Sequence, residues 1–256
     1  MEFYTPSNLI NTQISVAVVG VGGTGSYLLS MLSQMNYLLR AISDDAVSLR
    51  VTAYDPDTVS RFNCGRQNFY MMDIGKNKAQ VLTERLNMGW GTRWQWQAQC
   101  YSPDWCRENV VFTCVDNIAS RLDLGKRWRG KGSETLWIDG GNSATQGNVI
   151  CGHLGLPDSE TRLPNWFDLY GDIMQHEKDD ATESCSHEQS ILKQDFGINH
   201  FTALMMCQYL WRLLRHGKIA HHVQMFDMAE GELASLQIDP QMWQTFNFHP
   251  DDALMH

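Results

Sequence analysis

The sequence has few basic residues, no long apolar run and no closely spaced cysteine pair. Its 20 lysines and arginines are outnumbered by 29 aspartates and glutamates, which gives a formal net charge of -9. Nucleic acids and anionic membranes bind surfaces with net or clustered positive charge, so neither is expected as a partner. No apolar run reaches the about eighteen residues of a membrane-spanning helix, and residues 1–13 lack the basic and apolar regions of a signal peptide. We therefore expect a cytoplasmic protein.

The seven cysteines are scattered, and no Cys-x-x-Cys pair occurs. In a reducing cytosol such cysteines are free thiols rather than a disulfide framework. A structural zinc needs four ligands at workable spacing, and no such set can be written from this sequence. The adjacent histidines His221 and His222 are explained more simply as the start of a strand. The sequence therefore predicts no structural zinc.

Residues 14–26, ISVAVVGVGGTGS, place a glycine-rich turn directly after a β-branched run. The run suits a strand buried on both faces, and an apolar helical pattern begins immediately after the glycines. Because glycine lacks a Cβ atom, Gly20, Gly22 and Gly23 would let backbone amides and the positive end of the helix approach a phosphate closely. A purely structural turn between a strand and a helix gives the same spacing. The segment is a candidate nucleotide cradle.

A second strand is predicted over residues 51–57, and its end carries Asp55. An acidic residue at this place receives a ribose hydroxyl in nucleotide-binding folds. The loop and helix that follow supply polar and cationic side chains: Asn63, Arg66, Gln67 and Lys78. Fixed donors of this kind match the charge of a triphosphate, whereas a hydride-transfer enzyme has no need of them. The pattern therefore disfavours a nicotinamide enzyme.

Strand and helix patterns alternate through the first half of the chain. Helices are predicted over residues 24–42, 76–88 and from about 117 to 128, and strands over 94–99, 110–115 and 136–142. This alternation predicts an α/β, Rossmann-like fold with a mostly parallel sheet flanked by helices and a ligand crevice at the carboxyl ends of the strands. Asp116 follows one buried strand. It could hold magnesium beside a phosphate or simply cap the next helix.

The second half of the chain changes character. Residues 151–187 lose helical and strand periods and predict a mobile crossover segment, over 151–190, across the active-site face. Residues 191–215 predict a long buried helix with a break at Gly197, and residues 222–238 predict two strands joined by a glycine turn. We expect one domain over 1–256, with a nucleotide-binding core at 14–150 and a C-terminal helix and β extension at 191–256.

Five blocks of residues occur in a fixed order: the glycine turn at 20–25, the Asp55-x-Asp57 pair, Asn63 with Arg66 and Gln67, Lys78, and CVDN at 114–117 followed by Arg121. This series resembles the E1-like adenylyltransferase superfamily, which includes the bacterial ThiF, MoeB and HesA enzymes and the ubiquitin-activating enzymes. The segments YDPDTVSRFNCGRQ, SCS and QDFGIN look most like the ThiF-family member of the PRTRC gene cassette. The resemblance covers most of the chain.

The resemblance implies ATP- and Mg²⁺-dependent adenylation of the C-terminal carboxylate of a small ubiquitin-like protein. The glycine turn would admit the nucleotide, Asp55 would take the ribose, and Asp116 would hold Mg²⁺. The triphosphate would be held by Asn63, Arg66 and Lys78, and Asp57 and Gln67 are further candidates for binding the nucleotide. Two of these residues have simpler interpretations, since Asp57 and Asn63 both suit turns.

Relatives also raise expectations about partners. In the better-known ones an arginine near the N-terminus reaches the ATP of a partner subunit, yet residues 1–13 here contain no arginine. A homodimer and a heterodimer both stay open, and so does an inactive nucleotide-binding scaffold. The intact set of Arg66, Lys78 and Asp116 favours the enzyme. Many relatives hold zinc with two Cys-x-x-Cys pairs, which this chain lacks.

Cys185 lies where thioester-forming relatives carry a cysteine. A thiolate can attack an acyl adenylate because sulfur is a strong nucleophile even when it is only partly ionised. The nearby acids Glu183 and Glu188 would raise the pKa of the thiol, which weighs against strong activation. Thioester formation on Cys185 and an incidental cysteine are both consistent with the sequence.

Overall fold

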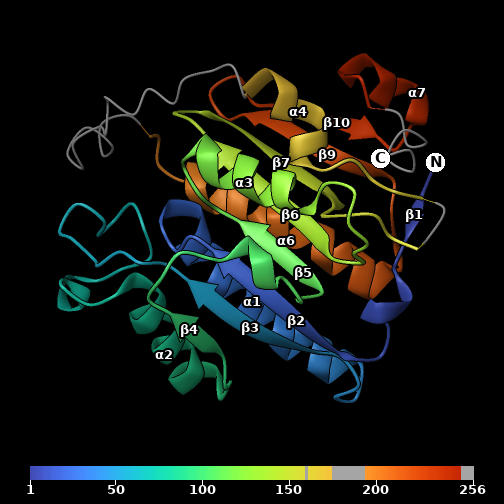
Figure 1. Cartoon of the computed structure of the whole chain (residues 1–256). Helices are drawn as coiled ribbons and strands as arrows, with labels where there is room; N and C mark the ends of the chain where they lie inside the picture. The colour runs from blue at the N-terminus through green and yellow to red at the C-terminus, as the bar shows by residue number, and fades with distance from the viewer. Residues whose placement is uncertain (159–160, 175–193, 249–256) are drawn as a thin grey trace.

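One mixed sheet organises the structure, a computed structural model that describes residues 1–158, 161–174 and 194–248. Its eight strands follow the order β10-β9-β7-β6-β5-β2-β3-β4 (Figure 1). In chain order these are β2 (Gln13–Val19), β3 (Ser48–Tyr54), β4 (Gln95–Gln97), β5 (Val110–Thr113), β6 (Leu136–Asn142), β7 (Gln146–His153), β9 (His221–Asp227) and β10 (Glu232–Gln237). A separate pairing joins β1 (Phe3–Tyr4) to β8 (Lys218–Ile219).

The strands from β4 to β6 in this order run parallel to one another. Ile14, Val16 and Val18 of β2 are buried, as a β-branched run covered on both faces requires. Parallel strands end at the same edge of a sheet, so the loops after β2, β3, β5 and β6 are brought together. The predicted Rossmann-like, mostly parallel sheet is confirmed.

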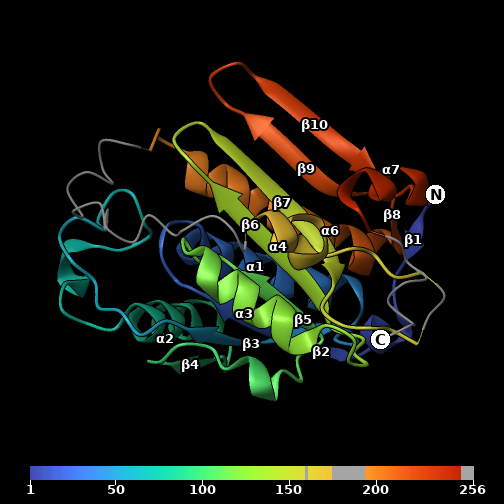
Figure 2. The same cartoon turned by 45° about the horizontal axis from the view of Figure 1, so that its top comes forward.

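The other side of the sheet is antiparallel. β7 pairs with β6 and β9, and β10 forms the outer edge (Figure 2). The predicted C-terminal strand pair is confirmed as the β9–β10 hairpin, which turns at Gly231 with φ +68°. The hairpin extends the central sheet.

The sequence pattern predicts no regular strand or helix over residues 151–187, and this expectation is wrong at two places. β7 continues to His153, and α4 spans Trp166–Met174. The reason lies in the glycines: a Cβ atom at Gly152 would lie 2.6 Å from the Cα atom of Asn165, so the strand needs a gap in its apolar pattern there. Because close packing requires a glycine here, the strand lacks the regular apolar pattern by which strands are recognised in a sequence.

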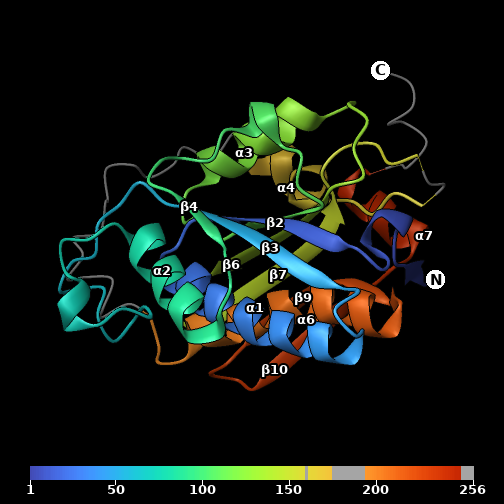
Figure 3. The same ribbon diagram turned by 90° about the horizontal axis from the view of Figure 1, so that it is seen from below.

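Helices cover both faces of the sheet. α1 (Gly23–Ile42), α2 (Lys78–Trp90) and α6 (Ile198–His216) lie on one face, and α3 (Ile118–Trp128) and α4 lie on the other (Figure 3). Shorter helical turns are η1 (Ser7–Leu9), η2 (Met71–Asp73), η3 (Pro103–Trp105), α7 (Pro240–Trp243) and η4 (Gln244–Phe246). α1 and α6 pack against each other, so the N-terminal ends of both can reach the strand ends.

The helix predicted over residues 191–215 begins later than expected. α6 begins directly after Gly197, whose φ of +92° places it in the left-handed region that ends or starts helices rather than continuing them. Residues 194–197 are therefore outside the helix, and residues 191–193 lie outside the described part of the chain. Residues 194–197 form a turn, in which the backbone N–H of Asp195 donates to the carbonyl oxygen of Ala144 at 3.0 Å and so holds Gln194 near the end of β6.

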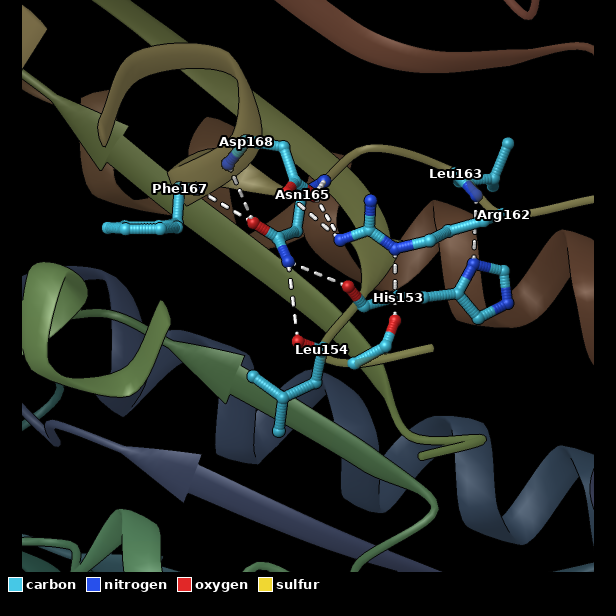
Figure 4. Close-up of polar contacts among 8 residues, drawn as sticks. His153, Leu154, Arg162, Leu163, Asn165, Phe167 and Asp168 are labelled. Carbon is cyan, nitrogen blue, oxygen red and sulfur yellow. Dashed lines mark hydrogen bonds and ion pairs between the residues drawn. The ribbon is translucent and has the colours of Figure 1, made fainter. Parts of the chain in front are cut away.

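A buried polar cluster holds the start of α4 against the end of β7 (Figure 4). Asn165 Oδ1 accepts hydrogen bonds from the backbone N–H groups of Phe167 (2.8 Å) and Asp168 (3.0 Å), and so caps the helix. Arg162 forms a salt bridge of 2.7 Å to Asp168. The Nδ1 atom of His153 accepts from the backbone N–H of Leu163 at 2.9 Å. These contacts hold α4 in place, although the sequence shows no regular helix or strand pattern in this region.

Candidate functional site

The glycine turn after β2 is tightly built. Gly20 has a φ of +87°, and a Cβ atom there would lie 2.9 Å from the carbonyl oxygen of Cys114. A Cβ atom on Gly25 would collide with the carbonyl oxygen of Gly20, and one on Gly23 would lie 2.5 Å from Asn199 Oδ1 in α6. Gly22 differs: only Gln67 Nε2, at 3.9 Å, would be near its Cβ atom. Gly20 and Gly23 are thus required by packing, and Gly22 faces open space at the start of α1.

Asp55 joins the glycine turn to the end of β3. Its Oδ2 accepts from the backbone N–H of Val21 at 2.6 Å, and its Oδ1 accepts from that of Asp57 at 2.9 Å. Burial raises the pKa of this carboxyl, while Lys78 and the two backbone donors oppose that rise. The side chain therefore lies where the sequence predicts it and holds the two turns together.

Asp57 and Lys78 form an ion pair. Lys78 Nζ lies 2.9 Å from Asp57 Oδ2, with the lysine buried and the carboxylate exposed. Asn77, the cap of α2, donates from Nδ2 to the carbonyl oxygens of Asp55 (2.8 Å) and Asp57 (3.0 Å). Sequence reasoning did not identify Asn77, although an asparagine directly before a helix is a recognisable cap. Asp57 thus fixes Lys78 in addition to shaping its turn.

Arg66 is half-buried, and the charge of Asp116 acts on its guanidinium. Burial lowers the pKa of the guanidinium, and the charge of Asp116 opposes that shift. Asp116 is exposed after β5, and the cap of α3 is Asn117, whose Oδ1 accepts from the backbone N–H of Ser120 at 2.8 Å. The alternative role of Asp116 as the helix cap is therefore wrong, and its carboxylate is exposed and close enough to act on the charge of Arg66.

Asn63 and Gln67 behave differently although both are buried. Asn63 Oδ1 accepts from the backbone N–H (2.7 Å) and the hydroxyl (3.1 Å) of Ser60, which matches the turn role. Gln67 Oε1 has no hydrogen-bond partner among the described residues, and neither does Arg66 Nε. Buried polar atoms are nearly always paired, so an unpaired acceptor and an unpaired donor on adjacent residues fit a ligand with both donors and acceptors.

Arg121 lies behind this site in a buried ion pair. Its Nε donates to Asp139 Oδ1 at 2.8 Å, and its Nη2 donates to the carbonyl oxygen of Gly140 at 3.3 Å. The hydroxyl of Thr113 also donates to Asp139 Oδ1. The pair ties α3 to the ends of β5 and β6. Sequence reasoning noted Arg121 and missed Asp139, which comes from the next strand.

A groove of about 510 Å³ opens beside the end of β6, on the antiparallel side of the sheet. Its lining residues come from β6, β7, β9, β10 and the turn after β6, and they include Gly141, Asn142, Asn148, Met225, Asp227 and Glu232. Asn142 also donates to Thr24 of α1 at 2.9 Å. Asn142 therefore both lines the groove and contacts the start of α1 beside the strand ends.

The described residues contain no group of three or more His, Cys, Asp or Glu side chains that could hold a metal ion. Asp116 is thus a single carboxylate, and the absence of zinc stays a prediction. Burial raises the pKa of the Cys151 thiol to about 12 and also raises those of Cys114 and Cys207. Cys185 lies outside the described residues.

No helix within the described ranges is both long and apolar enough to cross a membrane.

Comparisons with known proteins give the family and the fold of the chain. The model of a family described as ThiF family matches residues 8–245. None of the curated proteins matches the chain. The crystal structure of PaaA is similar with a TM-score of 0.62 and 14% identity, covering 88% of this chain and 64% of that one.

Two structures of E. coli MccB are similar as well. MccB with ATP and MccB with MccA each give a TM-score of 0.60 and 13% identity, covering 90% of this chain and 65% of that one. At this identity the likeness shows the fold. The chain spans 64% to 65% of the length of these structures.

Proposed function

The chain belongs to the ThiF family, and from that premise we propose that it is an E1-like adenylyltransferase that uses ATP and Mg²⁺. The observation that carries the proposal is the placement of Arg66 and Gln67. Each has a buried polar atom without a hydrogen-bond partner among the described residues, and the Gln67 side chain lies beside Gly22 at the N-terminal end of α1. A helix N-terminus with nearby cationic donors favours phosphate groups.

The strand-end residues fit a nucleotide with its ribose near Asp55 and its phosphates near Arg66. Each oxygen of the Asp55 carboxylate accepts one backbone hydrogen bond and keeps a further lone pair for a ribose hydroxyl. Lys78, held by Asp57, and Arg66 add positive charge on the phosphate side. Asp116 would supply one carboxylate to Mg²⁺, which takes its other ligands from phosphate oxygens and water.

The reaction that these residues would support is attack of a carboxylate oxygen on the α-phosphorus of ATP. A new P–O bond forms, the bond to the β,γ-pyrophosphate breaks, and pyrophosphate leaves with its charge. ATP supplies the adenylyl group and the leaving group. Arg66 and Lys78 would stabilise charge that builds on the phosphates, and the rigid strand ends would hold both in position.

The acceptor in this proposal is the C-terminal tail of a small ubiquitin-like protein, encoded beside this chain in a PRTRC gene cassette. The solved MccB structures include one with MccA, a partner of that protein. Here the groove beside β6 would take the extended tail, because Asn142, which lines the groove, is hydrogen-bonded to Gln194, and Gln194 is hydrogen-bonded to Arg66. The tail would end with its carboxylate toward the phosphates.

We expect Mg²⁺-dependent ATP binding and exchange of labelled pyrophosphate into ATP in the presence of that small protein. The physical reason is the cationic end of the site, which suits a triphosphate rather than NAD. Isothermal titration with ATP and with NAD, followed by the exchange assay, measures both. Tight NAD binding with no ATP binding would contradict the proposal, and ATP binding without exchange would indicate the inactive scaffold.

Cys185→Ala is expected to keep pyrophosphate exchange and to lose any thiol-sensitive covalent adduct with the acceptor. Adenylation would rest on Asp55, Arg66, Lys78 and Asp116, so a thiol elsewhere is not required for it. In a second step the Cys185 thiolate would attack the acyl carbon, form the thioester and release AMP. Mass spectrometry of the trapped adduct tests this step. An adduct that persists in Cys185→Ala would show that another group carries it.

A further inference from the structure

Arg66 has a defined hydrogen-bond partner in Gln194, which precedes α6. Arg66 Nη1 donates to Gln194 Oε1 at 2.8 Å. The same oxygen accepts from Asn199 Nδ2 at 3.2 Å, and that Nδ2 also lies 3.5 Å from the carbonyl oxygen of Arg66. Gln194 and Arg66 are separated by 128 positions in sequence, so only the fold brings them together.

The direction of each hydrogen bond behind Gln194 is determined by its neighbours. The Thr202 hydroxyl donates to the carbonyl oxygen of Ile198 at 2.8 Å, and the Thr24 hydroxyl donates to Asn199 Oδ1 at 3.4 Å. Both hydroxyl oxygens therefore act as acceptors toward Asn142 Nδ2, at 3.0 Å and 2.9 Å. The Asn142 amide nitrogen is thus directed at the helices, and its Oδ1 is directed at Gln194.

This fixes the orientation of the Gln194 amide. Its Nε2 donates to Asn142 Oδ1 at 2.9 Å, so its Oε1 must face Arg66. A flipped amide would place an oxygen against Asn142 Oδ1 and an NH₂ group against the guanidinium. It would lose the bonds of Gln194 to Asn142, Arg66 and Asn199. The network is therefore directional from the backbone of α6 to Arg66.

We propose that Gln194 is a positioning residue, which holds the Arg66 guanidinium at the strand ends for the phosphates of the nucleotide. This inference rests on the proposed function of the site. A neutral amide suits the role because it orients the guanidinium without neutralising it, whereas a carboxylate would compensate the charge that a triphosphate needs. Arg66 Nε stays without a partner among the described residues and is available to the ligand.

The test is a double-mutant cycle on the binding of Mg·ATP, measured by titration calorimetry with the full chain. Gln194→Met keeps the length of the side chain and removes the acceptor, and it is expected to weaken binding by about tenfold to a hundredfold, as loss of a hydrogen bond to a charged group does. In the Arg66→Ala background the same change is expected to have no further effect. Gln241→Met, on the exposed surface of α7, is the matched control and should bind as the parent does.

A general loss of packing at Gln194 would weaken both backgrounds equally, so additive effects would overturn the proposal. A crystal structure of Gln194→Met gives a second measurement that needs no ATP, and it is expected to show the Arg66 guanidinium displaced. A guanidinium that keeps its place would also overturn it. If the parent chain fails to bind ATP, the proposed function fails, and the displacement of Arg66 still decides the role of Gln194.

Discussion

Arg66→Ala is expected to lower the rate of ATP–pyrophosphate exchange on the order of 10²–10³-fold while the protein stays folded, the loss typical of one positioned charge contact. The guanidinium is half-buried in a loop outside the hydrophobic core, and its side chain bonds to Gln194 rather than to a strand. Removal of the guanidinium takes one donor from Gln194 Oε1, which still accepts from Asn199 Nδ2 at 3.2 Å, so no buried acceptor is left unpaired. The effect should therefore fall on activity.

Asp116→Ala is expected to act in the same direction, because this exposed carboxylate is not the cap of α3 and its removal leaves Asn117 in place. Arg93→Ala is the matched control: Arg93 is exposed and precedes β4, at the amino ends of the parallel strands and so at the opposite edge of the sheet. Thermal melting should show all three variants folded. Parent-like exchange in both Arg66→Ala and Asp116→Ala would make the assignment of these residues wrong.

The sequence was sufficient to predict the parallel part of the sheet and the edge at which the candidate residues meet. Strands such as β2, with Ile14, Val16 and Val18, are continuous apolar runs bounded by turns, so their type is readable locally. The carboxyl-end rule then brings Asp55 and Asp116 to one edge without further information. These predictions needed only local pattern and general topology.

The antiparallel strand β7 and helix α4 were not predictable in this way. Gly147 would carry a Cβ atom 2.9 Å from the Gly141 carbonyl oxygen, and Gly152 packs against the loop before α4. The sequence therefore contains small residues where an isolated strand would show apolar ones. The need for small residues at these positions arises only from contacts in the folded protein, so the sequence shows no periodic pattern that would predict the strand.

The polar network around Gln194 was missed for the same kind of reason. Apart from two bonds within residues 194–202, its bonds join residues 52 to 175 positions apart, and they depend on the close approach of α1 and α6 at Gly23. The QDFGIN segment was noted as part of a resemblance, but its amide groups carry no local signal of what they bond. The turn role of Asn63, by contrast, could be predicted from the sequence, because its amide oxygen accepts from Ser60 in the same predicted loop.

Two fully buried histidines should make the protein unstable in mild acid. His153 Nδ1 accepts from the backbone N–H of Leu163, and His222 Nε2 accepts from Trp243 Nε1 at 2.7 Å, so both rings are neutral. Burial lowers the pKa of His153 to about 3, with Arg162 adding to the shift, and lowers that of His222 to about 4, with His221 adding to it. In the unfolded chain both would titrate near about 6.5.

The sign of the pH dependence follows from these shifts. Below about pH 6.5 the unfolded chain binds protons at both histidines and the folded chain does not, so the free energy of unfolding falls as the pH falls toward the folded values. Their contribution is complete above the unfolded pKa. At pH 5 each histidine should remove about 2 kcal/mol relative to pH 7.

Urea unfolding should therefore show a lower free energy of unfolding at pH 5 than at pH 7. Two substitutions together should largely remove this difference. His153→Asn keeps an acceptor near the place of Nδ1 for Leu163, and His222→Gln keeps one near the place of Nε2 for Trp243, so each removes a titrating ring with a limited change in bonding. Asp55 and Asp168, whose pKa values burial raises, titrate in every variant and cancel in the comparison. His216→Asn, at an exposed position, should keep the parent's pH dependence. If the double variant lost as much stability between pH 7 and pH 5 as the parent, these histidines would not be the cause, and the acid sensitivity would have to arise from other groups, such as His200 and His221, whose pKa values burial also lowers.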